Sequence, residues 1–247
     1  MNYGDIVQLG QHRLMCGDAT KREYVDKLLD GRKVDLILTD PPYGMKAQNK
    51  DGSIGGKHRG GGGYPYSKDT LPLTRFCKQK KYPMLLGDEN QDTAQAYYEV
   101  TKDICKKQII FGGQYFAHFL PVNGGWLFWD KLNGGGSFSD GELAWRSWGK
   151  KVYKYEHKWN GMIRAGNPKL NGKTRIHPTQ KPVELFARIL EDFSEQGDII
   201  LDCFGGSGTT LIACMMTKRL CFMMEYSAEY CDLIEGRYYD LKGLFID

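Results

Sequence analysis

The sequence predicts an α/β protein built on a mostly parallel sheet. Two observations favour this class: short apolar runs typical of buried strands alternate with segments that carry apolar residues at helical spacing, and one such run leads into a glycine-rich turn. The chain has 247 residues, 41% hydrophobic and 26% charged, which fits one large soluble domain or two small ones with enough apolar residues for a core. Because neither an internal repeat nor an interdomain linker is evident, we expect a single domain over residues 1–247.

The first elements are predicted to be a strand, a helix and a second strand. Residues 12–16 form a short apolar run, and Thr20 and Glu23 have the spacing of a capping box ahead of a helix. Residues 34–39 (VDLILT) are almost continuously apolar, as expected of a parallel strand buried on both faces.

The rest of the chain continues the alternation. The central part predicts a helix at 93–106 followed by four strands at 108–111, 126–129, 143–148 and 152–159. The last two strands alternate apolar and polar residues, as antiparallel strands do. The C-terminal third predicts a helix from Pro182, a strand at 198–202, a helix from Thr209, a strand at 220–224 and a helix from Ala228.

Composition excludes several classes of protein. No stretch approaches the roughly 18 to 20 apolar residues of a membrane span, and residues 1–5 have neither region of a signal peptide. We therefore expect a cytoplasmic protein that does not associate with membranes. The seven cysteines are odd in number and lack a C-x-x-C spacing, which predicts neither a disulfide framework nor a metal site. Most of them are expected to be small core residues.

The net charge of +4 is unevenly distributed. Residues 44–82 hold nine Lys and Arg against two Asp, for +7, and residues 150–181 hold nine against one Glu, for +8, which leaves −11 on the rest. Both basic segments contain aromatic residues that could stack on bases, among them Tyr64, Tyr153 and Trp159. The segments are either solvated loops or contacts for a polyanion, and their pairing favours the polyanion.

A glycine-rich turn follows the strand that ends at Asp202. Its sequence, DCFGGSGTT, would let the backbone approach a ligand closely and present free amides at the start of a helix. It matches neither a Walker A loop nor the dinucleotide fingerprint, because no Gly-Lys-Ser/Thr is present and Leu211 stands where the third Gly would be. Glu225 ends the next strand, where an acid that accepts from ribose hydroxyls is expected, so the pair favours a nucleoside cofactor.

The tetrad Asp40-Pro41-Pro42-Tyr43 follows the buried strand that ends at Thr39. Two prolines fix the backbone and remove two amide donors, which leaves carbonyl acceptors in a rigid turn. A Pro-Pro pair alone would only end a strand, but here a carboxylate precedes it and an aromatic ring follows. Two acceptors and a ring are the parts needed to hold a planar base by its amino group.

In this order the motifs resemble the S-adenosylmethionine-dependent DNA amino-methyltransferases of the beta group, whose motif order is circularly permuted. The resemblance covers nearly the whole chain. It also includes Cys16–Ala19, Phe111–Gly113, Gly125–Leu127 and His177–Pro182. It implies a mostly parallel seven-stranded methyltransferase (Rossmann-like) sheet with an antiparallel edge hairpin, S-adenosylmethionine as cofactor and double-stranded DNA as substrate.

The resemblance also implies a reaction and a set of site residues. A methyl group would pass to the exocyclic N6 amine of a flipped adenine, since a leading Asp in the tetrad favours adenine over the N4 amine of cytosine. The implied catalytic residues are Asp40, Pro41, Pro42 and Tyr43. Asp18 would contact the cofactor adenine, Glu225 the ribose hydroxyls, and Thr179 and Lys181 the carboxylate end. The remaining implied cofactor-binding residues are Ala19, Asp202, Phe204, Gly205, Gly206, Ser207, Gly208 and Thr209.

The expected DNA contacts lie in the basic Gly-rich loop at 44–82 and in a small target-recognition insert at 150–176. The candidate residues are Lys57, Arg59, Lys150, Lys151, Lys154, Lys158 and Arg164. Larger family members have a longer insert, so we expect a short or relaxed recognition sequence. His58 and His157 are expected on the surface. Relatives commonly dimerise, which leaves a homodimer open.

Three other interpretations fit parts of the sequence. A cytosine-N4 enzyme shares the fold and cofactor and differs only in the methylated base. A non-catalytic DNA-binding protein of the same fold is disfavoured by the intact tetrad, glycine turn and Glu225. A nicotinamide or flavin oxidoreductase would explain Gly205–Gly208 but leaves the tetrad without a role.

Overall fold

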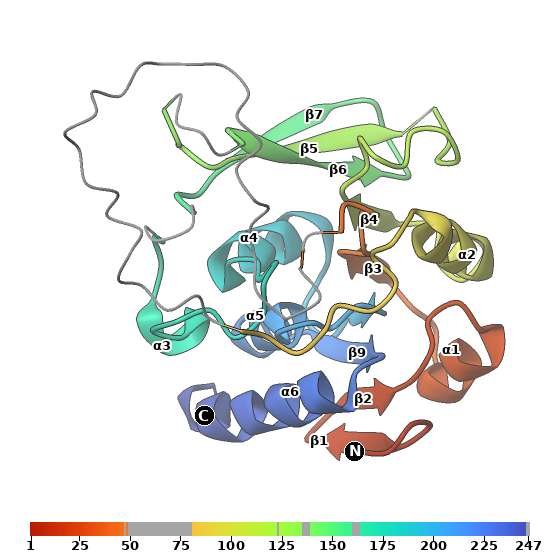
Figure 1. Cartoon of the computed structure of the whole chain (residues 1–247), viewed down its shortest axis with the longest axis vertical. Coiled ribbons are helices and arrows are strands. Elements are labelled where there is room, and N and C mark those ends of the chain that lie inside the picture. The colour runs from red at the N-terminus through yellow and green to blue at the C-terminus, as the bar shows by residue number, and fades with distance from the viewer. Residues whose placement is uncertain (47, 49–80, 123, 135–138, 160–163, 246–247) are drawn as a thin grey trace, which may run out of the picture.

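A computed structural model describes residues 1–46, 48, 81–122, 124–134, 139–159 and 164–245. In this part of the chain, nine strands form one sheet in the order β1-β2-β9-β8-β3-β4-β6-β5-β7 (Figure 1). The strands are β1 (Ile6–Leu9), β2 (His12–Cys16), β3 (Leu36–Thr39), β4 (Gln108–Phe111), β5 (Gly125–Asp130), β6 (Gly141–Arg146), β7 (Val152–Glu156), β8 (Ile199–Asp202) and β9 (Leu220–Glu225). The helices are α1 (Arg22–Leu29), α2 (Asp92–Thr101), α3 (Pro168–Asn171), α4 (Val183–Phe193), α5 (Thr209–Thr217), α6 (Ala228–Leu241) and a 3₁₀ turn η2 (Lys242–Leu244).

The centre of the sheet is parallel, which confirms the predicted class. Strands β2, β9, β8, β3 and β4 all run the same way. Strand β1 pairs antiparallel with β2 at one edge, and β6 lies antiparallel between β4 and β5. The sheet has nine strands rather than the expected seven. The short strand β1 carried no clear apolar pattern, because it is partly exposed at the edge.

The prediction that β7 is antiparallel is wrong, because β7 pairs parallel with β5 at the other edge of the sheet. The alternation of apolar and polar residues in β7 reflects the exposure of one face of the strand, not the direction of its neighbour. Val152 is 59% exposed whereas Tyr155 is 4% exposed, as expected of an edge strand with one covered face.

Helices cover both faces of the sheet. Helices α4, α5 and α6 lie on one face and α1 and α2 on the other (Figure 1). The first group shares one large core cluster, in which Phe111 of β4 stacks on Phe186 of α4 at 5.1 Å. Helix α5 is buried along most of its length between α4 and β9, which explains why nearly all its residues are apolar.

Two helix boundaries differ from the predictions. The capping box does not form: α1 begins after Lys21, and the Thr20 hydroxyl instead donates to Asp18 Oδ1 at 2.6 Å. Helix α2 ends at Thr101 rather than near 106. The buried side-chain amide of Gln108 donates to the carbonyls of Thr101 and Cys105, so it satisfies backbone acceptors left free where the helix ends.

The topology brings four parallel strands to a common edge. The carboxyl ends of β2, β9, β8 and β3 lie side by side, so the loops that follow them meet there. Among the described residues, no helix is long and apolar enough to cross a membrane. The six cysteines in this part of the chain are buried and unbridged, which confirms their expected core role.

Candidate active site

A cavity of about 770 Å³ opens at the carboxyl ends of these strands. The turn after β3, with the Asp-Pro-Pro-Tyr tetrad, and the glycine turn after β8 both line it. Asp18 after β2 and Glu225 at the end of β9 complete one wall. The parallel sheet therefore joins in one cavity two motifs that lie about 160 residues apart in the sequence.

Asp202 anchors the glycine turn. Its Oδ1 accepts from the Thr39 hydroxyl at 2.7 Å and from the Phe204 amide at 3.1 Å, and its Oδ2 accepts from the Thr210 hydroxyl at 2.5 Å. Burial raises the pKa of this carboxyl to about 7. Since both oxygens are used within the protein, Asp202 acts here by holding the turn against β3.

Glu225 lies across the same turn. Its Oε2 accepts from the Gly206 amide at 2.7 Å and its Oε1 from the Ser227 amide at 2.9 Å. Gly206 has a φ of +53°, a left-handed conformation that favours glycine, so the turn can follow this tight path. Burial raises the pKa of Glu225.

The loop after β2 lines the cavity beside the end of β9. Cys16 pairs in register with Glu225, which places Asp18 close to the end of β9. Asp18 Oδ1 accepts from the Thr20 amide at 2.9 Å, and Ala19 is buried beside it. Two carboxylates thus face the part of the cavity where the resemblance placed the adenosine of a cofactor.

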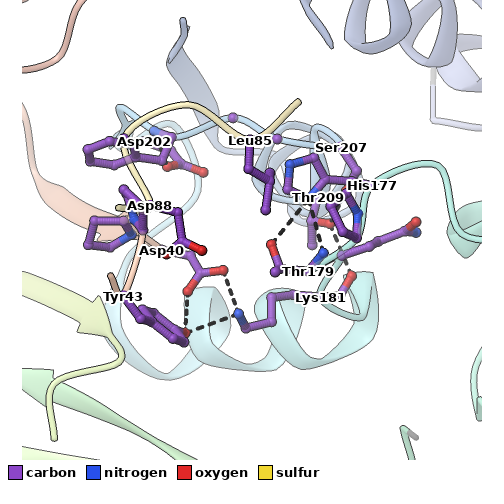
Figure 2. Close-up of a pocket in the computed structure, with 18 of the residues that line it drawn as sticks. Asp40, Tyr43, Leu85, Asp88, His177, Thr179, Lys181, Asp202, Ser207 and Thr209 are labelled. Carbon is purple, nitrogen blue, oxygen red and sulfur yellow. Dashed lines mark hydrogen bonds and ion pairs between the residues drawn. The ribbon is translucent and has the colours of Figure 1, made fainter. Parts of the chain in front are cut away.

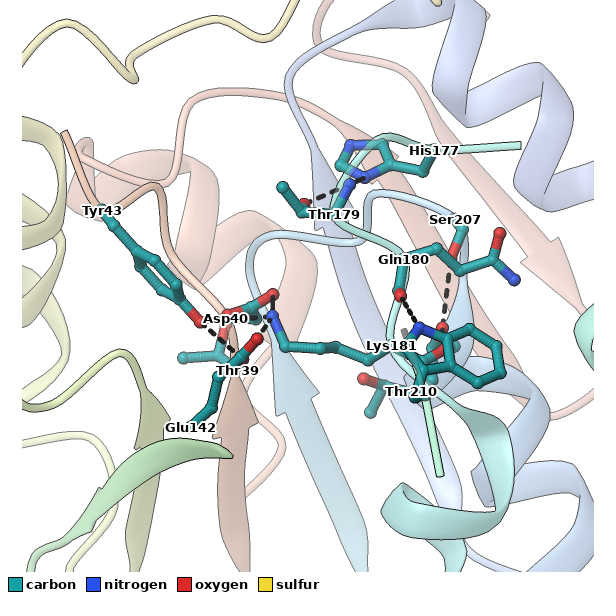
Figure 3. A network of polar contacts seen from close by, with 12 residues as sticks. Thr39, Asp40, Tyr43, Glu142, His177, Thr179, Gln180, Lys181, Ser207 and Thr210 are labelled. Carbon is teal, nitrogen blue, oxygen red and sulfur yellow. Dashed lines mark hydrogen bonds and ion pairs between the residues drawn. The ribbon is translucent and has the colours of Figure 1, made fainter. Parts of the chain in front are cut away.

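Asp40 lies at the other end of the cavity and already holds a donor on each oxygen. The Tyr43 hydroxyl donates to its Oδ1 at 2.5 Å, and the Lys181 ammonium donates to its Oδ2 at 2.5 Å (Figures 2 and 3). Burial raises the pKa of Asp40, although Lys181 acts in the opposite direction. Pro41 is buried beneath the turn.

The ammonium group of Lys181 lies at the end of the cavity that holds the tetrad. The resemblance assigned it to the carboxylate end of the cofactor, which stays a prediction; in the structure its ammonium contacts Asp40 and lies 3.3 Å from Glu142 Oε2 (Figure 3). Glu142 Oε1 is in turn paired with Lys131. The motif fixes the backbone position of Lys181, and the long aliphatic side chain places the ammonium group some distance from it.

Glu142 was missed by the sequence analysis. It projects from β6, about 100 residues after Asp40 in the sequence, and its side chain is 17% exposed. Burial raises its pKa, but Lys181 and Lys131 outweigh that effect and lower the pKa overall. The available signal was a charged residue in a segment of otherwise strand-like sequence.

The ring of Tyr43 is held by its neighbours. It stacks on Tyr115 with ring centroids 5.1 Å apart and meets the edge of Phe116 at 6.0 Å. The backbone of Gly112 passes close beneath it, since a Cβ on Gly112 would lie 2.5 Å from Tyr43 Cδ1. The ring therefore has a fixed place beside Asp40.

The segment before α4 connects the two ends of the cavity. The buried His177 ring packs on Tyr230 at 4.6 Å and accepts from the Thr179 amide at 3.3 Å, and burial lowers its pKa to about 3, so it is neutral. The Thr209 hydroxyl donates to the Lys181 carbonyl at 3.0 Å, which ties the glycine turn to this segment. Ser207 is buried in the same turn and Thr179 lines the cavity, whereas Gly208 starts α5 with a φ of +75°.

The expected DNA-binding residues differ in their surroundings. Lys57 and Arg59 lie outside the described residues. Lys150 and Lys151 are exposed in the turn between β6 and β7. Lys154 pairs with Asp130 at 2.9 Å and with Glu156 at 2.7 Å, so its charge is balanced locally. The last two donate to backbone carbonyls: Lys158 to Leu132 at 2.7 Å and Arg164 to Lys173 at 2.8 Å.

Two aromatic residues of this segment are more buried than predicted. His157 was expected on the surface but is 9% exposed, and its carbonyl accepts from the indole nitrogen of Trp129. Trp159 was a candidate for base stacking but is 3% exposed, and its indole nitrogen donates to the Gln180 carbonyl at 3.0 Å. Trp159 packs in the core cluster that includes α4, and the His157 ring lies 6.1 Å from it. In the described ranges no group of three or more His, Cys, Asp or Glu is placed to hold a metal.

Comparison with known proteins gives consistent results. The model of the N6/N4 family described as "DNA methylase" matches residues 65–236. The type II methyltransferase M.HpaI of Haemophilus parainfluenzae is 26% identical over 259 residues, covering 91% of this chain and 73% of that protein. The M1.HpyAVI–SAM complex superposes with a TM-score of 0.54 at 18% identity, covering 91% of this chain and 97% of that one. The cytosine-N4-specific PvuII DNA methyltransferase superposes with a TM-score of 0.52 at 16% identity, covering 99% and 96%.

Proposed function

The chain belongs to the N6/N4 DNA methylase family, and on that premise we propose that it transfers a methyl group from S-adenosylmethionine to the N6 amine of adenine in DNA. One observation carries the proposal: the Asp40 carboxylate and the glycine turn line a single cavity. A base held at Asp40 and a cofactor held at the turn would meet within it.

The residues of the cofactor wall fit S-adenosylmethionine. Glu225 and Asp18 offer carboxylate acceptors for ribose hydroxyls and an adenine amine. Gly205, Gly206 and Ser207 of the glycine turn line the same cavity beside them. When bound, the cofactor supplies an electrophilic methyl group on a sulfonium, which needs no further activation.

Asp40 and Pro41 would act on the target amine. The amine is a poor nucleophile because its lone pair is delocalised into the ring. Hydrogen bonds from its two N–H groups to the Asp40 carboxylate and the Pro41 carbonyl would draw the nitrogen towards tetrahedral geometry and stabilise the developing positive charge. Pro42 lacks an N–H, so no backbone donor competes at that position. Tyr43 would pack on the flipped base, which partly offsets the few kcal/mol that unstacking costs.

The leading Asp of the tetrad supports adenine as the target. The specific alternative is the N4 amine of cytosine, which presents the same two hydrogens to the same acceptors. The similarity in fold to the cytosine-N4-specific PvuII enzyme keeps this alternative in view.

The test uses the purified chain, labelled S-adenosylmethionine and unmethylated DNA, with the product nucleoside identified by mass spectrometry. N6-methyladenine is expected, and N4-methylcytosine would overturn the choice of base. Asp40→Ala should abolish transfer but leave cofactor affinity within about tenfold, since Asp40 contacts the target amine. Asp26→Ala, at an exposed site on α1, is the matched control. A near-normal rate for Asp40→Ala would contradict the assignment, and cofactor binding without transfer by the unmodified chain would indicate a non-catalytic DNA-binding protein.

We also propose that the protein reads a short or relaxed DNA sequence. The segment at 150–176 is small, and three of its five candidate basic residues are engaged by the protein itself. Each good bidentate base contact contributes only about 1–3 kcal/mol of discrimination. Methylation mapping after expression in a methylation-free host tests this, and a site of six or more defined bases would refute it.

A further inference from the structure

The acceptor proposed for the target amine is occupied by the protein's own cation. Lys181 Nζ lies 2.5 Å from Asp40 Oδ2, and the Lys181 side chain is 7% exposed. As the amine nitrogen takes up a methyl group it becomes positively charged. An ammonium at this distance would oppose that charge in a site with little water to screen it. Lys181 must therefore leave Oδ2 for Asp40 to act on the amine.

A second acceptor for Lys181 lies beside the first. Glu142 Oε2 is 3.3 Å from Lys181 Nζ, so the ammonium lies between two carboxylates (Figure 3). Glu142 projects from β6 and Lys181 precedes α4, and each is backed by well-buried structure. Rotation of the terminal bonds of Lys181 would move the ammonium from one carboxylate to the other without a backbone change.

We infer that Glu142 receives the Lys181 ammonium when the target amine takes its place on Asp40. Lys181 balances the negative charge of Asp40 while no base is bound, and Glu142 binds the Lys181 ammonium when the base enters. Both are positioning residues, because they act through Asp40 and not on the reacting atoms. The inference rests on the proposed function of Asp40.

The ionisation of the cluster supports this exchange. Burial raises the pKa of Glu142, but the opposite effect of Lys181 and Lys131 is larger and the pKa falls below its ordinary value. Glu142 is therefore ionised and can accept an ammonium. Burial lowers the pKa of Lys181, but Asp40 and Glu142 raise it overall, so Lys181 stays charged. Among the described residues, the charged and titratable groups that act on Asp40 or lie at its end of the cavity are Tyr43, Lys181, Glu142, Asp202 and Asp88, with Lys131 and Arg175 beside Glu142.

The two positioning residues should shift the pH profile in opposite directions. Lys181 lowers the pKa of Asp40 and Glu142 raises it. Lys181→Met should therefore move the acidic limb of methyl transfer to higher pH, and Glu142→Gln should move it to lower pH, each by roughly one unit. Glu142→Gln should also reduce the plateau of single-turnover transfer about tenfold, because Lys181 stays on Asp40.

Methyl transfer is measured against pH for the two variants, for Glu142→Asp and for a control pair on α2. Lys102→Met and Glu99→Gln make matched changes in an exposed ion pair and should leave the profile unchanged. Glu142→Asp should restore part of the plateau, because a carboxylate remains. If Lys181→Met fails to fold, Glu142→Gln alone decides, since general damage would not move its acidic limb to lower pH.

The two hypotheses can fail separately. If the unmodified chain transfers no methyl group, the proposed function fails. If it transfers methyl groups but the limbs of the variants do not move, or move in the same direction, the exchange of Lys181 is refuted and the function stands.

Discussion

Replacing Gly112 by alanine should disable the target-base end of the cavity and spare the cofactor end. Gly112 follows β4 with a φ of +75°, and a Cβ there would lie 2.5 Å from Tyr43 Cδ1. The ring cannot simply rotate away, because Tyr115 stacks on it and its hydroxyl is hydrogen-bonded to Asp40. The added methyl group must push the ring out of its place beside Asp40.

The expected loss of stability has two parts. An alanine in the left-handed region costs about 1–2 kcal/mol. Displacement of the Tyr43 ring weakens a hydrogen bond to a charged group, worth about 1.5–3 kcal/mol, and a ring stack worth about 0.5–1.5 kcal/mol. Since the displaced ring keeps part of these interactions, Gly112→Ala should lower the free energy of unfolding by about 2–5 kcal/mol.

Gly31→Ala is the matched control. Gly31 has a φ of +74°, nearly that of Gly112, but nothing lies within 4 Å of an added Cβ. Gly31→Ala should therefore lower the free energy of unfolding only by the backbone cost of a left-handed alanine, about 1–2 kcal/mol. Denaturant unfolding gives both values.

Activity measurements then separate backbone strain from the displacement of Tyr43. Isothermal titration should show S-adenosylmethionine affinity within about threefold of the unmodified chain for both variants, because Gly112 does not line the cofactor wall. Methyl transfer should fall at least about tenfold only in Gly112→Ala. Equal transfer by the two variants would refute the claim that the ring position matters.

Three further predictions concern other parts of the molecule. Thr39→Val removes a donor 2.7 Å from the buried carboxylate of Asp202 and should cost about 1–3 kcal/mol in urea unfolding; no measurable loss would contradict the anchoring role. Burial lowers the pKa of His12 to about 4, so below about pH 6.5 the unfolded state binds a proton that the folded state does not. The free energy of unfolding should therefore fall by up to about 3 kcal/mol as the pH drops from about 6.5 towards 4. An unfolding series against pH checks this, and a His12→Gln variant with the same slope would argue against it. Replacing Lys150 and Lys151 by Gln should weaken DNA binding and reduce the salt slope by about one unit for each phosphate that is no longer neutralised; an unchanged slope would place the DNA elsewhere.

The parallel centre of the fold could be predicted because its strands are buried on both faces. Leu36–Thr39 and Ile199–Asp202 are entirely buried, so each appears in the sequence as an unbroken apolar run followed by a distinctive turn. The edge strands gave weaker signals. Val152–Glu156 is mostly exposed, and its alternation says which face is covered but not which way its neighbour runs.

The candidate site was only partly predictable for a related reason. Asp40 and Glu225 follow strands and stand in local motifs, so their place in the fold follows from the sequence. Glu142 has no such context, because it comes near Asp40 only through the pairing of β6 with β4. A motif fixes the backbone position of Lys181 but not the end of its long side chain.

The pairing of β2 with β9 has a consequence for how the protein is made. Two parts of one cavity wall are synthesised at different times, Asp18 early and Glu225 late, yet the strands that carry them are direct neighbours in the sheet. Pairing between strands so distant in the sequence slows the formation of the fold, because a long loop must close first. A nascent chain on the ribosome carries Asp40 long before β9 is made and the cavity can close. With Glu225 in the proposed cofactor-binding role, only a chain extended through β9 carries the complete cofactor wall.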